Sequence, residues 1–333
     1  MKRRGKILGT KTIFTKNEIK EILLNYNLGE LICFEPVTNG TVETNYFIET
    51  TLDKFVFRYY EERSKESVQF EVNLIRYLKK KDYPCPGVYK SKHGKYVNFY
   101  NGKPYVLFEF IQGVHEDNPG EEQERQLIEM VAKLQNITRN YKPFYKNARW
   151  NYGVDLCRKL ARREAKRIDT ANSREKLKWL ENELAKLQLP QSLPKGICHC
   201  DFHFSNVLFK DGKIRALLDF DDANYTYLLF DLAYLIEPFA SAFKWDTWEN
   251  FKKADSILDF SKARKTVKEY MKHRPLSEIE KRHLFDVYKL SVLMDCVWYF
   301  ERGNAKDFYE KRKIDALNEL GRGKFFEKIF KKA

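Results

Sequence analysis

The sequence predicts an α+β protein with two lobes, a small lobe built on an antiparallel sheet and a larger helical lobe. Its 333 residues correspond to about two domains at roughly 150 residues each. Up to residue 113, short runs rich in β-branched and aromatic residues alternate with stretches of helical periodicity. Beyond that point, apolar residues recur mainly at helical spacing. We therefore expect a mostly β lobe at residues 12–113 and a helical lobe at residues 114–333.

The first lobe is expected to begin with a short helix, because Thr15 is a suitable N-cap ahead of apolar residues at helical spacing. A second, amphipathic helix is expected over residues 66–82, since its apolar residues lie on one face and two prolines follow it. The predicted strands are LICFEPV, TNYFIETT and KFVFRYYEE, followed by a hairpin in KYVNFYNGKPYVLFEFIQG whose turn is Asn101-Gly102.

Helical periodicity dominates the second lobe. The expected helices span residues 121–138, 153–169, 173–187, 245–254, 261–273 and 277–302. Ser277, with Glu280 three positions later, predicts a capping box at the start of the last of these helices. One β-rich island, GICHCDFHFSNVLFKDGKIRALLDFDDA, interrupts the pattern, and its Asp211-Gly212 pair predicts a second hairpin.

Charge and composition exclude several classes of protein. The net charge is +14, but the basic runs are not interleaved with the exposed aromatic residues that nucleic-acid modules use, so we expect no nucleic-acid partner. No run approaches the ~20 apolar residues of a membrane helix, and no secretory signal is evident. We therefore expect a cytoplasmic protein, monomeric or homodimeric, whose six cysteines are reduced thiols.

The spacing of polar residues in the β-rich island suits phosphoryl transfer from ATP. Asn206 follows Asp201 by five positions, and Asp219 follows Asn206 by thirteen, a gap that a hairpin can close. Such a reaction needs an acceptor hydroxyl held in line and metal ions on the phosphates. Asp201 can accept the hydroxyl proton, while Asn206 and Asp219 offer oxygen ligands of the kind that Mg²⁺ prefers. The chain has no GxxxxGK[ST] loop to provide a competing ATP site.

The same segments resemble a known group of enzymes. CHCDFHFSNVLF, LLDFDDA and FDLAYLI are similar to the signature of the aminoglycoside phosphotransferase and choline kinase superfamily, which has a protein-kinase-like fold. The order of segments over about residues 14–302, including NGTVETNYFIETT and NGKPYVLFEFIQG, is most similar to the type II homoserine kinases. The resemblance implies a bilobal kinase that uses ATP and Mg²⁺ to phosphorylate a hydroxyl of a small molecule.

The resemblance also implies roles for individual residues of the island. Asp201 would be the catalytic base, and His199 would support its loop. Asn206 and Asp219 would bind Mg²⁺. Asp231 would hold the backbone of the catalytic loop through hydrogen bonds.

In the first lobe the resemblance implies which residues bind the nucleotide. Gly40, within residues 39–45, would belong to the turn over the phosphates, and Glu71 would pair with Arg58 on the third strand. Glu109, Phe110 and Ile111 would form the hinge segment that meets adenine. Two departures stand out: Arg58 replaces the lysine of protein kinases, and Cys200 replaces a common glycine of the catalytic loop.

The sequence is compatible with several phosphate acceptors. The resemblance to type II homoserine kinases favours homoserine or a related amino-alcohol. Choline or ethanolamine would suit an aromatic cage built with Tyr234 and Trp298, whereas an aminoglycoside would suit the acids Asp221 and Glu237. A nucleotide-binding pseudokinase without activity is a further alternative, and the retention of Asp201 argues against it.

Overall fold

A computed structural model describes residues 11–38, 42–241, 248–250 and 256–331. The chain forms two compact units that are discontinuous in sequence. Unit 1 comprises the described parts of Met1–Pro119, together with Asn140–Arg149 and Phe204–Asp221. Unit 2 comprises Gly120–Arg139, Trp150–His203 and the described parts of Asp222–Ala333. The predicted lobes, 12–113 and 114–333, are continuous stretches, so three segments of the predicted second lobe, residues 114–119, 140–149 and 204–221, group with the first unit.

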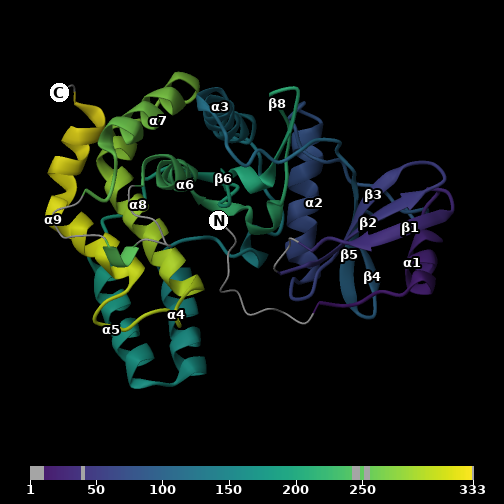
Figure 1. The fold of residues 1–333 in the computed structure, drawn as a ribbon, viewed down its shortest axis with the longest axis horizontal. Helices are drawn as coiled ribbons and strands as arrows, with labels where there is room; N and C mark the ends of the chain where they lie inside the picture. The colour runs from purple at the N-terminus through teal and green to yellow at the C-terminus, as the bar shows by residue number, and fades with distance from the viewer. Residues whose placement is uncertain (1–10, 39–41, 242–247, 251–255, 332–333) are drawn as a thin grey trace. The chain divides into compact units, whose positions relative to one another are not determined.

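Unit 1 contains a five-stranded antiparallel sheet with the strand order β1-β2-β3-β5-β4. Its strands are β1 (Leu31–Pro36), β2 (Thr44–Thr50), β3 (Lys54–Tyr59), β4 (Asn98–Tyr100) and β5 (Lys103–Glu109). Helix α1 (Lys16–Leu23) contacts β1, and helix α2 (Lys65–Lys79) contacts β5 (Figure 1). Thr15 forms the predicted N-cap of α1 in a complete capping box with Glu18. The predicted elements of this part of the chain are therefore confirmed.

The alternation of residues along β3 separates the core of unit 1 from a polar face. Phe55, Phe57 and Tyr59 are buried in a hydrophobic cluster that also contains residues of α1 and β2. Val56 and Arg58, the residues between them, must point to the opposite face of the sheet. On that face Arg58 lies opposite Asn45 of β2, because the two residues are paired in register.

The second predicted hairpin is present and belongs to unit 1. Strands β7 (Val207–Lys210) and β8 (Lys213–Leu217) are antiparallel, and both Asp211 and Gly212 have the positive φ that a tight turn requires. Phe209 pairs with Val114 through two backbone hydrogen bonds of 2.8 and 2.9 Å, which ties the hairpin to the segment after β5.

Unit 2 is mainly helical. Its helices are α3 (Glu121–Ile137), α4 (Val154–Ile168), α5 (Ala171–Ala185), α6 (Leu229–Ala240), α7 (Phe260–His273), α8 (Glu278–Trp298) and α9 (Tyr309–Phe330). A two-stranded sheet pairs β6 (Lys195–Cys198) with β9 (Asn224–Tyr227). Short 3₁₀ turns occur in both units: Lys146–Ala148 and Phe204–Asn206 lie in unit 1, Trp248–Asn250 lies in unit 2, and Phe220–Asp222 lies where the chain passes from unit 1 to unit 2.

Two helices of unit 2 were not predicted from the sequence, and one predicted helix lies mostly outside the described residues. Helix α6 is buried on most sides, so its sequence has no polar face to reveal a helical period. Helix α9 contains Gly321, whose φ of 73° interrupts the helical pattern. Of the helix expected at 245–254, residues 248–250 are described, and they form a 3₁₀ turn.

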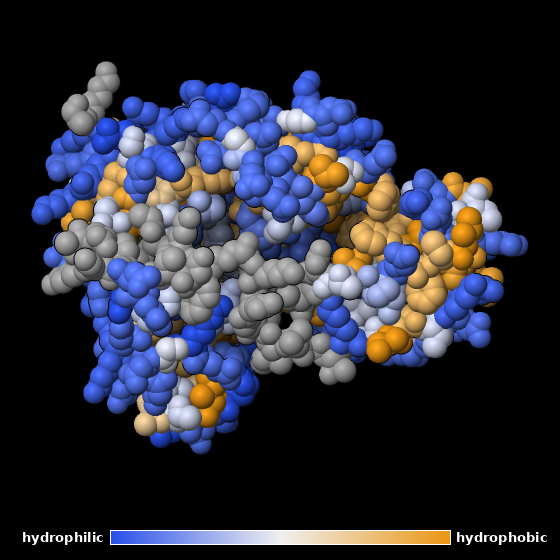
Figure 2. All heavy atoms as spheres, viewed as in Figure 1, coloured by the Kyte–Doolittle hydropathy of each residue, from blue (hydrophilic) through white to orange (hydrophobic). Residues whose placement is uncertain are grey.

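Figure 2 shows that the viewed face is largely hydrophilic, in keeping with a chain of which 32% is charged. The basic run in α4 is paired with acids: Arg162 donates to Glu181 at 2.6 Å, and Arg167 donates to Glu164 at 2.8 Å. Within the described ranges no helix is both long and apolar enough to cross a membrane.

Substitution of two glycines by alanine would test whether the positive φ of Gly102 contributes to stability. A Cβ added to Gly102 or to Gly323 would meet no atom within 4 Å, but only Gly102 has a positive φ, of 79°. Gly102→Ala should therefore lower the free energy of unfolding by about 1 kcal/mol. Gly323→Ala, in a helix, should raise it by about 0.5–1 kcal/mol. Urea unfolding of both variants measures the difference, and equal effects would contradict the assignment of a left-handed turn.

Candidate active site

A cavity of about 410 Å³ lies within unit 1. Its walls are apolar over much of their area and come from the sheet, the segment after β5 and the β7–β8 hairpin. The apolar lining includes Val37, Phe47, Val56, Ile75, Phe108, Leu208 and Leu218. The polar lining includes Asn45, Arg58, Glu71, Asn206 and Asp219. An apolar slot that opens onto a group of charges suits a molecule with a flat base and an anionic tail.

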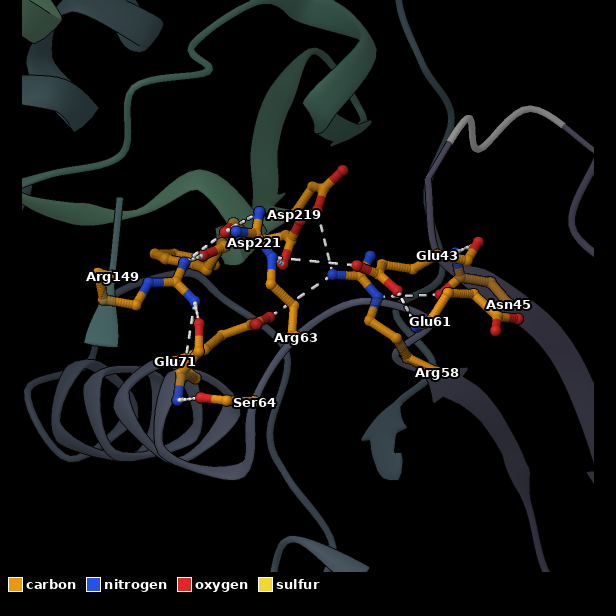
Figure 3. Close-up of polar contacts among 12 residues, drawn as sticks. Glu43, Asn45, Arg58, Glu61, Arg63, Ser64, Glu71, Arg149, Asp219 and Asp221 are labelled. Atoms are coloured by element: carbon orange, nitrogen blue, oxygen red, sulfur yellow. Dashed lines mark hydrogen bonds and ion pairs between the residues drawn. The ribbon is translucent and has the colours of Figure 1, made fainter. Parts of the chain in front are cut away.

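Arg58 is at the centre of the polar side chains that line the cavity (Figure 3). Its Nε donates a hydrogen bond of 2.9 Å to Asn45 Oδ1. Its Nη1 donates one of 3.0 Å to Asp219 Oδ1 and lies 3.5 Å from Glu71 Oε1. The pairing of Glu71 with Arg58 that the family resemblance implied is therefore present. With these three neighbours Arg58 is held in one orientation, and its side chain is only 15% exposed.

Glu71 is completely buried in helix α2. Burial raises the pKa of Glu71 to about 7, and the positive charge of Arg58 acts in the opposite direction. The carboxylate therefore depends on Arg58 for its charged form, because a buried anion without a cation takes up a proton instead. The two side chains form a mutually dependent pair at the wall of the cavity.

Asn206 and Asp219 are brought together at the open end of the β7–β8 hairpin. The backbone N–H of Leu218 donates to the backbone carbonyl of Asn206 at 2.8 Å, which closes the hairpin directly before Asp219. Both side chains line the cavity. One carboxylate and one amide oxygen fit Mg²⁺, which takes a few such oxygens and completes its shell with phosphate and water. Asp219 has a φ of 60°, a left-handed conformation that aspartate tolerates better than most residues.

The segment 109–111, predicted to meet adenine, lines the apolar side of the cavity. The Glu109 carboxylate accepts hydrogen bonds from the backbone of Gly87 at 2.8 Å and from Lys79 at 2.7 Å. Because that side chain is engaged, we expect the main chain of the segment and the side chains of Phe110 and Ile111 to contact a base. Gly40, the other predicted nucleotide contact, lies outside the described residues.

The predicted catalytic loop follows β6 in unit 2. Asp201 is 8% exposed, and its Oδ1 forms a hydrogen bond of 3.1 Å with Nε2 of His203. His199 is completely buried, with its ring centroid 4.7 Å from that of Phe202, as expected of a residue that supports the loop. Cys200, which replaces a common glycine, has a φ of 60°, the conformation that glycine adopts most easily.

Asp231, in the first turn of α6, holds the backbone of this loop. Its carboxylate accepts hydrogen bonds from the N–H of Cys200 at 2.9 Å and from the N–H of His199 at 3.1 Å. The side chain of Gln135 also donates to it, at 3.5 Å. The loop role predicted for Asp231 is therefore present. Complete burial raises the pKa of Asp231 from its ordinary value of 3.8 to about 7, against the lowering effect of the two backbone donors.

Each residue predicted to contact the acceptor makes contacts with other side chains of the protein. Asp221 is 6% exposed and forms two hydrogen bonds, of 2.9 and 2.7 Å, with the Arg63 guanidinium. This ion pair gives Asp221 a structural partner, and its role in acceptor contact stays a prediction.

The other three predicted acceptor residues lie in unit 2. The Tyr234 hydroxyl donates to Asp295 at 3.4 Å. The Glu237 carboxylate accepts hydrogen bonds from Tyr288 and Lys313. Trp298 stacks on Trp150 with ring centroids 5.6 Å apart. These contacts neither establish nor exclude an acceptor site, and the three roles stay predictions.

Sequence reasoning missed several residues that shape the site. Arg63, Arg149 and His203 contact predicted site residues, and Asn224 donates hydrogen bonds to the Cys200 thiol at 3.2 Å and the Asp222 carbonyl at 2.9 Å. His203 was within reach of sequence analysis, because it lies two positions from Asp201. The two arginines were not, because each lies more than 70 positions from Asp221.

Comparison with known proteins places the chain among phosphotransferases. The homoserine kinase of Afipia carboxidovorans is 29% identical over 305 residues, which cover 91% of this chain and 85% of that protein. The homoserine kinase of Methylobacillus flagellatus is 27% identical over 266 residues, 80% of this chain and 78% of that protein.

Solved structures of lower identity share the fold. The amicoumacin kinase hAmiN, in complex with AMP-PNP, Ca²⁺ and Ami, superimposes with a TM-score of 0.60 at 14% identity, covering 95% of this chain and 94% of its own. The spectinomycin phosphotransferase APH(9)-Ia, with ADP and spectinomycin, gives a TM-score of 0.57 at 14% identity, covering 96% and 98%. The fold is thus protein-kinase-like.

This fold and these relatives define an ATP-dependent kinase of small molecules, with Mg²⁺ as its expected metal. The characteristic sequence pattern of the phosphotransferase enzyme family matches residues 34–265. That match covers well over half of the chain, and the chain belongs to this family.

The buried carboxylate of Asp231 predicts a pH dependence of stability. Its pKa is about 7 in the folded protein and near 3.8 once exposed, so the folded state holds an extra proton between these values. The contribution of Asp231 to the free energy of unfolding is therefore fully present below about pH 4 and is lost as the pH rises to about 7. The free energy of unfolding of wild type, minus that of Asp231→Asn, should be larger at about pH 5 than at about pH 8.

Urea unfolding across this range measures the difference. Tyr270→Phe is the matched control, because it removes the hydroxyl that donates to Gln135 but keeps the titrating carboxylate. It should retain the pH dependence of wild type. A constant difference between wild type and Asp231→Asn would contradict the assignment.

Proposed function

We propose that this chain transfers the γ-phosphate of ATP to the side-chain hydroxyl of homoserine or of a closely related amino-alcohol. The similarity to two homoserine kinases over most of the length of both partners supports this acceptor. Homoserine carries both an ammonium and a carboxylate, so its site needs an acidic side chain and an Arg or Lys. In unit 2 Glu237 is hydrogen-bonded to Lys313, and Asp295 to Tyr234. These residues and Trp298 are the candidates for that site.

In this proposal the residues of unit 1 hold the nucleotide. Arg58 lines the cavity, where its Nη2, the guanidinium nitrogen not bonded to Asn45 or Asp219, can donate to a phosphate oxygen. Asn206 and Asp219 would hold Mg²⁺, which neutralises charge on the phosphates when bound. The hinge segment 109–111 would contact the adenine ring.

The proton of the acceptor hydroxyl would move to Asp201. The hydrogen bond from His203 orients this carboxylate, and Asp231 fixes the backbone of the loop that carries it. A carboxylate in this role accepts the proton as the oxygen–phosphorus bond forms, and it mainly aligns the hydroxyl for attack.

A screen for acceptor-dependent ADP release tests the proposed function. Purified protein with ATP and Mg²⁺ is offered homoserine, choline, ethanolamine and an aminoglycoside in separate reactions. Homoserine should give the highest kcat/KM. Preference for choline, ethanolamine or the aminoglycoside would replace the proposed acceptor, and absence of turnover with tight Mg²⁺-dependent ADP binding would indicate a pseudokinase.

Substitution of the proposed base gives a second test. Asp201→Asn should lower kcat at least roughly 10²-fold, because proton transfer and alignment are lost, while Mg²⁺-dependent ADP binding stays near wild type. Asp211→Asn, in the β7–β8 turn, removes a carboxylate from a turn position that asparagine also tolerates, and it should leave both quantities unchanged. Wild-type turnover by Asp201→Asn would refute the role of Asp201.

A further inference from the structure

The backbone that carries Asp219 is held by two arginines other than Arg58. Arg149 donates from Nη2 to the backbone carbonyls of Phe220, at 3.3 Å, and of Asp221. Its other nitrogen, Nη1, donates to Ser67 of helix α2, at 2.9 Å to the hydroxyl and 3.1 Å to the carbonyl. Arg149 therefore connects the two residues after Asp219 with helix α2.

Arg63 makes the second connection, through the side chain of Asp221 (Figure 3). Its Nε donates to Asp221 Oδ1 at 2.9 Å, and its Nη2 donates to Oδ2 at 2.7 Å and to the backbone carbonyl of the same residue at 3.2 Å. The side chains are 9% and 8% exposed. Two parallel hydrogen bonds between buried, oppositely charged groups fix the position of both.

The same arginine reaches the strand that contributes Asn45 to the cavity. Arg63 Nε lies 4.0 Å from Oε1 of Glu43, the residue before β2. The other oxygen of Glu43 accepts a hydrogen bond of 2.6 Å from the backbone of Glu61, after β3. Arg63 thus joins the start of β2, the end of β3 and the segment 219–221.

The hydrogen bonds of Arg63 and Arg149 constrain the backbone next to Asp219, which has an uncommon conformation. With a φ of 60°, its backbone is in a region that costs roughly 1–2 kcal/mol for most residues. Contacts on both sides oppose relaxation: the Leu218–Asn206 hydrogen bond precedes Asp219, and the bonds of Arg149 and Arg63 follow it. If the contacts after Asp219 were lost, the residue could move to a more common conformation and its carboxylate would change direction.

We propose that Arg63 and Asp221 are positioning residues, whose ion pair holds the backbone of residues 219–221 so that the Asp219 carboxylate stays directed at the metal on the nucleotide phosphates. This inference rests on the proposed role of Asp219 as a Mg²⁺ ligand. It assigns to Asp221 a role in metal affinity in place of acceptor recognition. Residues that orient metal ligands through hydrogen bonds typically change metal affinity by roughly 10–100-fold when they are substituted.

The test measures the Mg²⁺ concentration needed for half-maximal ADP binding, by calorimetry on the full-length chain. Asp221→Asn keeps the size of the side chain and removes its charge, so it should raise that concentration roughly tenfold or more. Arg63→Lys keeps the charge but loses the paired hydrogen bonds, and it should shift the requirement in the same direction by a smaller factor. The double variant should be no worse than Asp221→Asn, because both substitutions disrupt one ion pair.

Glu280→Gln is the matched control. Glu280 pairs with Arg274 at 2.6 Å in unit 2, with side chains 4% and 12% exposed, so its loss removes a comparable buried ion pair. It should lower the thermal midpoint without changing the Mg²⁺ requirement. A purely structural role for Asp221 would give the same pattern, and that result would overturn the inference.

Asp219→Asn separates this inference from the proposed function. If it weakens Mg²⁺-dependent ADP binding while Asp221→Asn and Arg63→Lys do not, the positioning role is refuted and Asp219 keeps its assignment. If wild type binds ADP with no dependence on Mg²⁺, both the metal site and the positioning role are refuted. An increased Mg²⁺ requirement in all three variants supports both.

Discussion

The guanidinium of Arg58 is the interaction on which the candidate site depends. It is hydrogen-bonded to Asn45 of β2 and to Asp219 after the second hairpin, and it forms an ion pair with the buried Glu71 of α2. Glu71 requires that positive charge because it is completely buried, and Asp219 takes its direction from the same side chain. A shorter or uncharged residue at this position would leave one acid unpaired in the protein interior and another without orientation. The arginine that stands where protein kinases have lysine suits this arrangement, because its planar fork can serve several acceptors at fixed angles.

Local signals in the sequence were sufficient for much of unit 1. Thr15 with Glu18, and the Asn101-Gly102 and Asp211-Gly212 turns, act over a few residues, and the structure confirms each of them. The thirteen-residue spacing of Asn206 and Asp219 predicted that a hairpin brings them together, and both line one cavity. The family resemblance added the pairing of Arg58 with Glu71 and the loop contacts of Asp231. These two sets of contacts join distant segments, and residue pattern alone would not have placed them.

The remaining features required the folded chain. Arg63 and Asp221 are 158 positions apart, and no periodicity or composition links them. Helix α6 gave no signal because it is apolar on most sides, so the contrast between buried and exposed faces that reveals a helix is missing. The extra acid at position 221 looked available for a substrate because its cation could not be seen in the sequence. Its actual partner comes from the loop before α2.

One of the boundaries between the compact units falls between His203 and Phe204, two residues after the proposed base Asp201 and two residues before Asn206. Every residue that lines the 410 Å³ cavity belongs to unit 1, whereas the loop of Asp201 and the aromatic and charged candidates for acceptor contact belong to unit 2. The cavity and the candidate acceptor residues thus belong to different compact units of the chain. Under the proposed roles, substitutions around Tyr234 and Trp298 would change the molecule that is modified without altering any residue that lines the cavity. Such a division would let one architecture serve kinases with different acceptors.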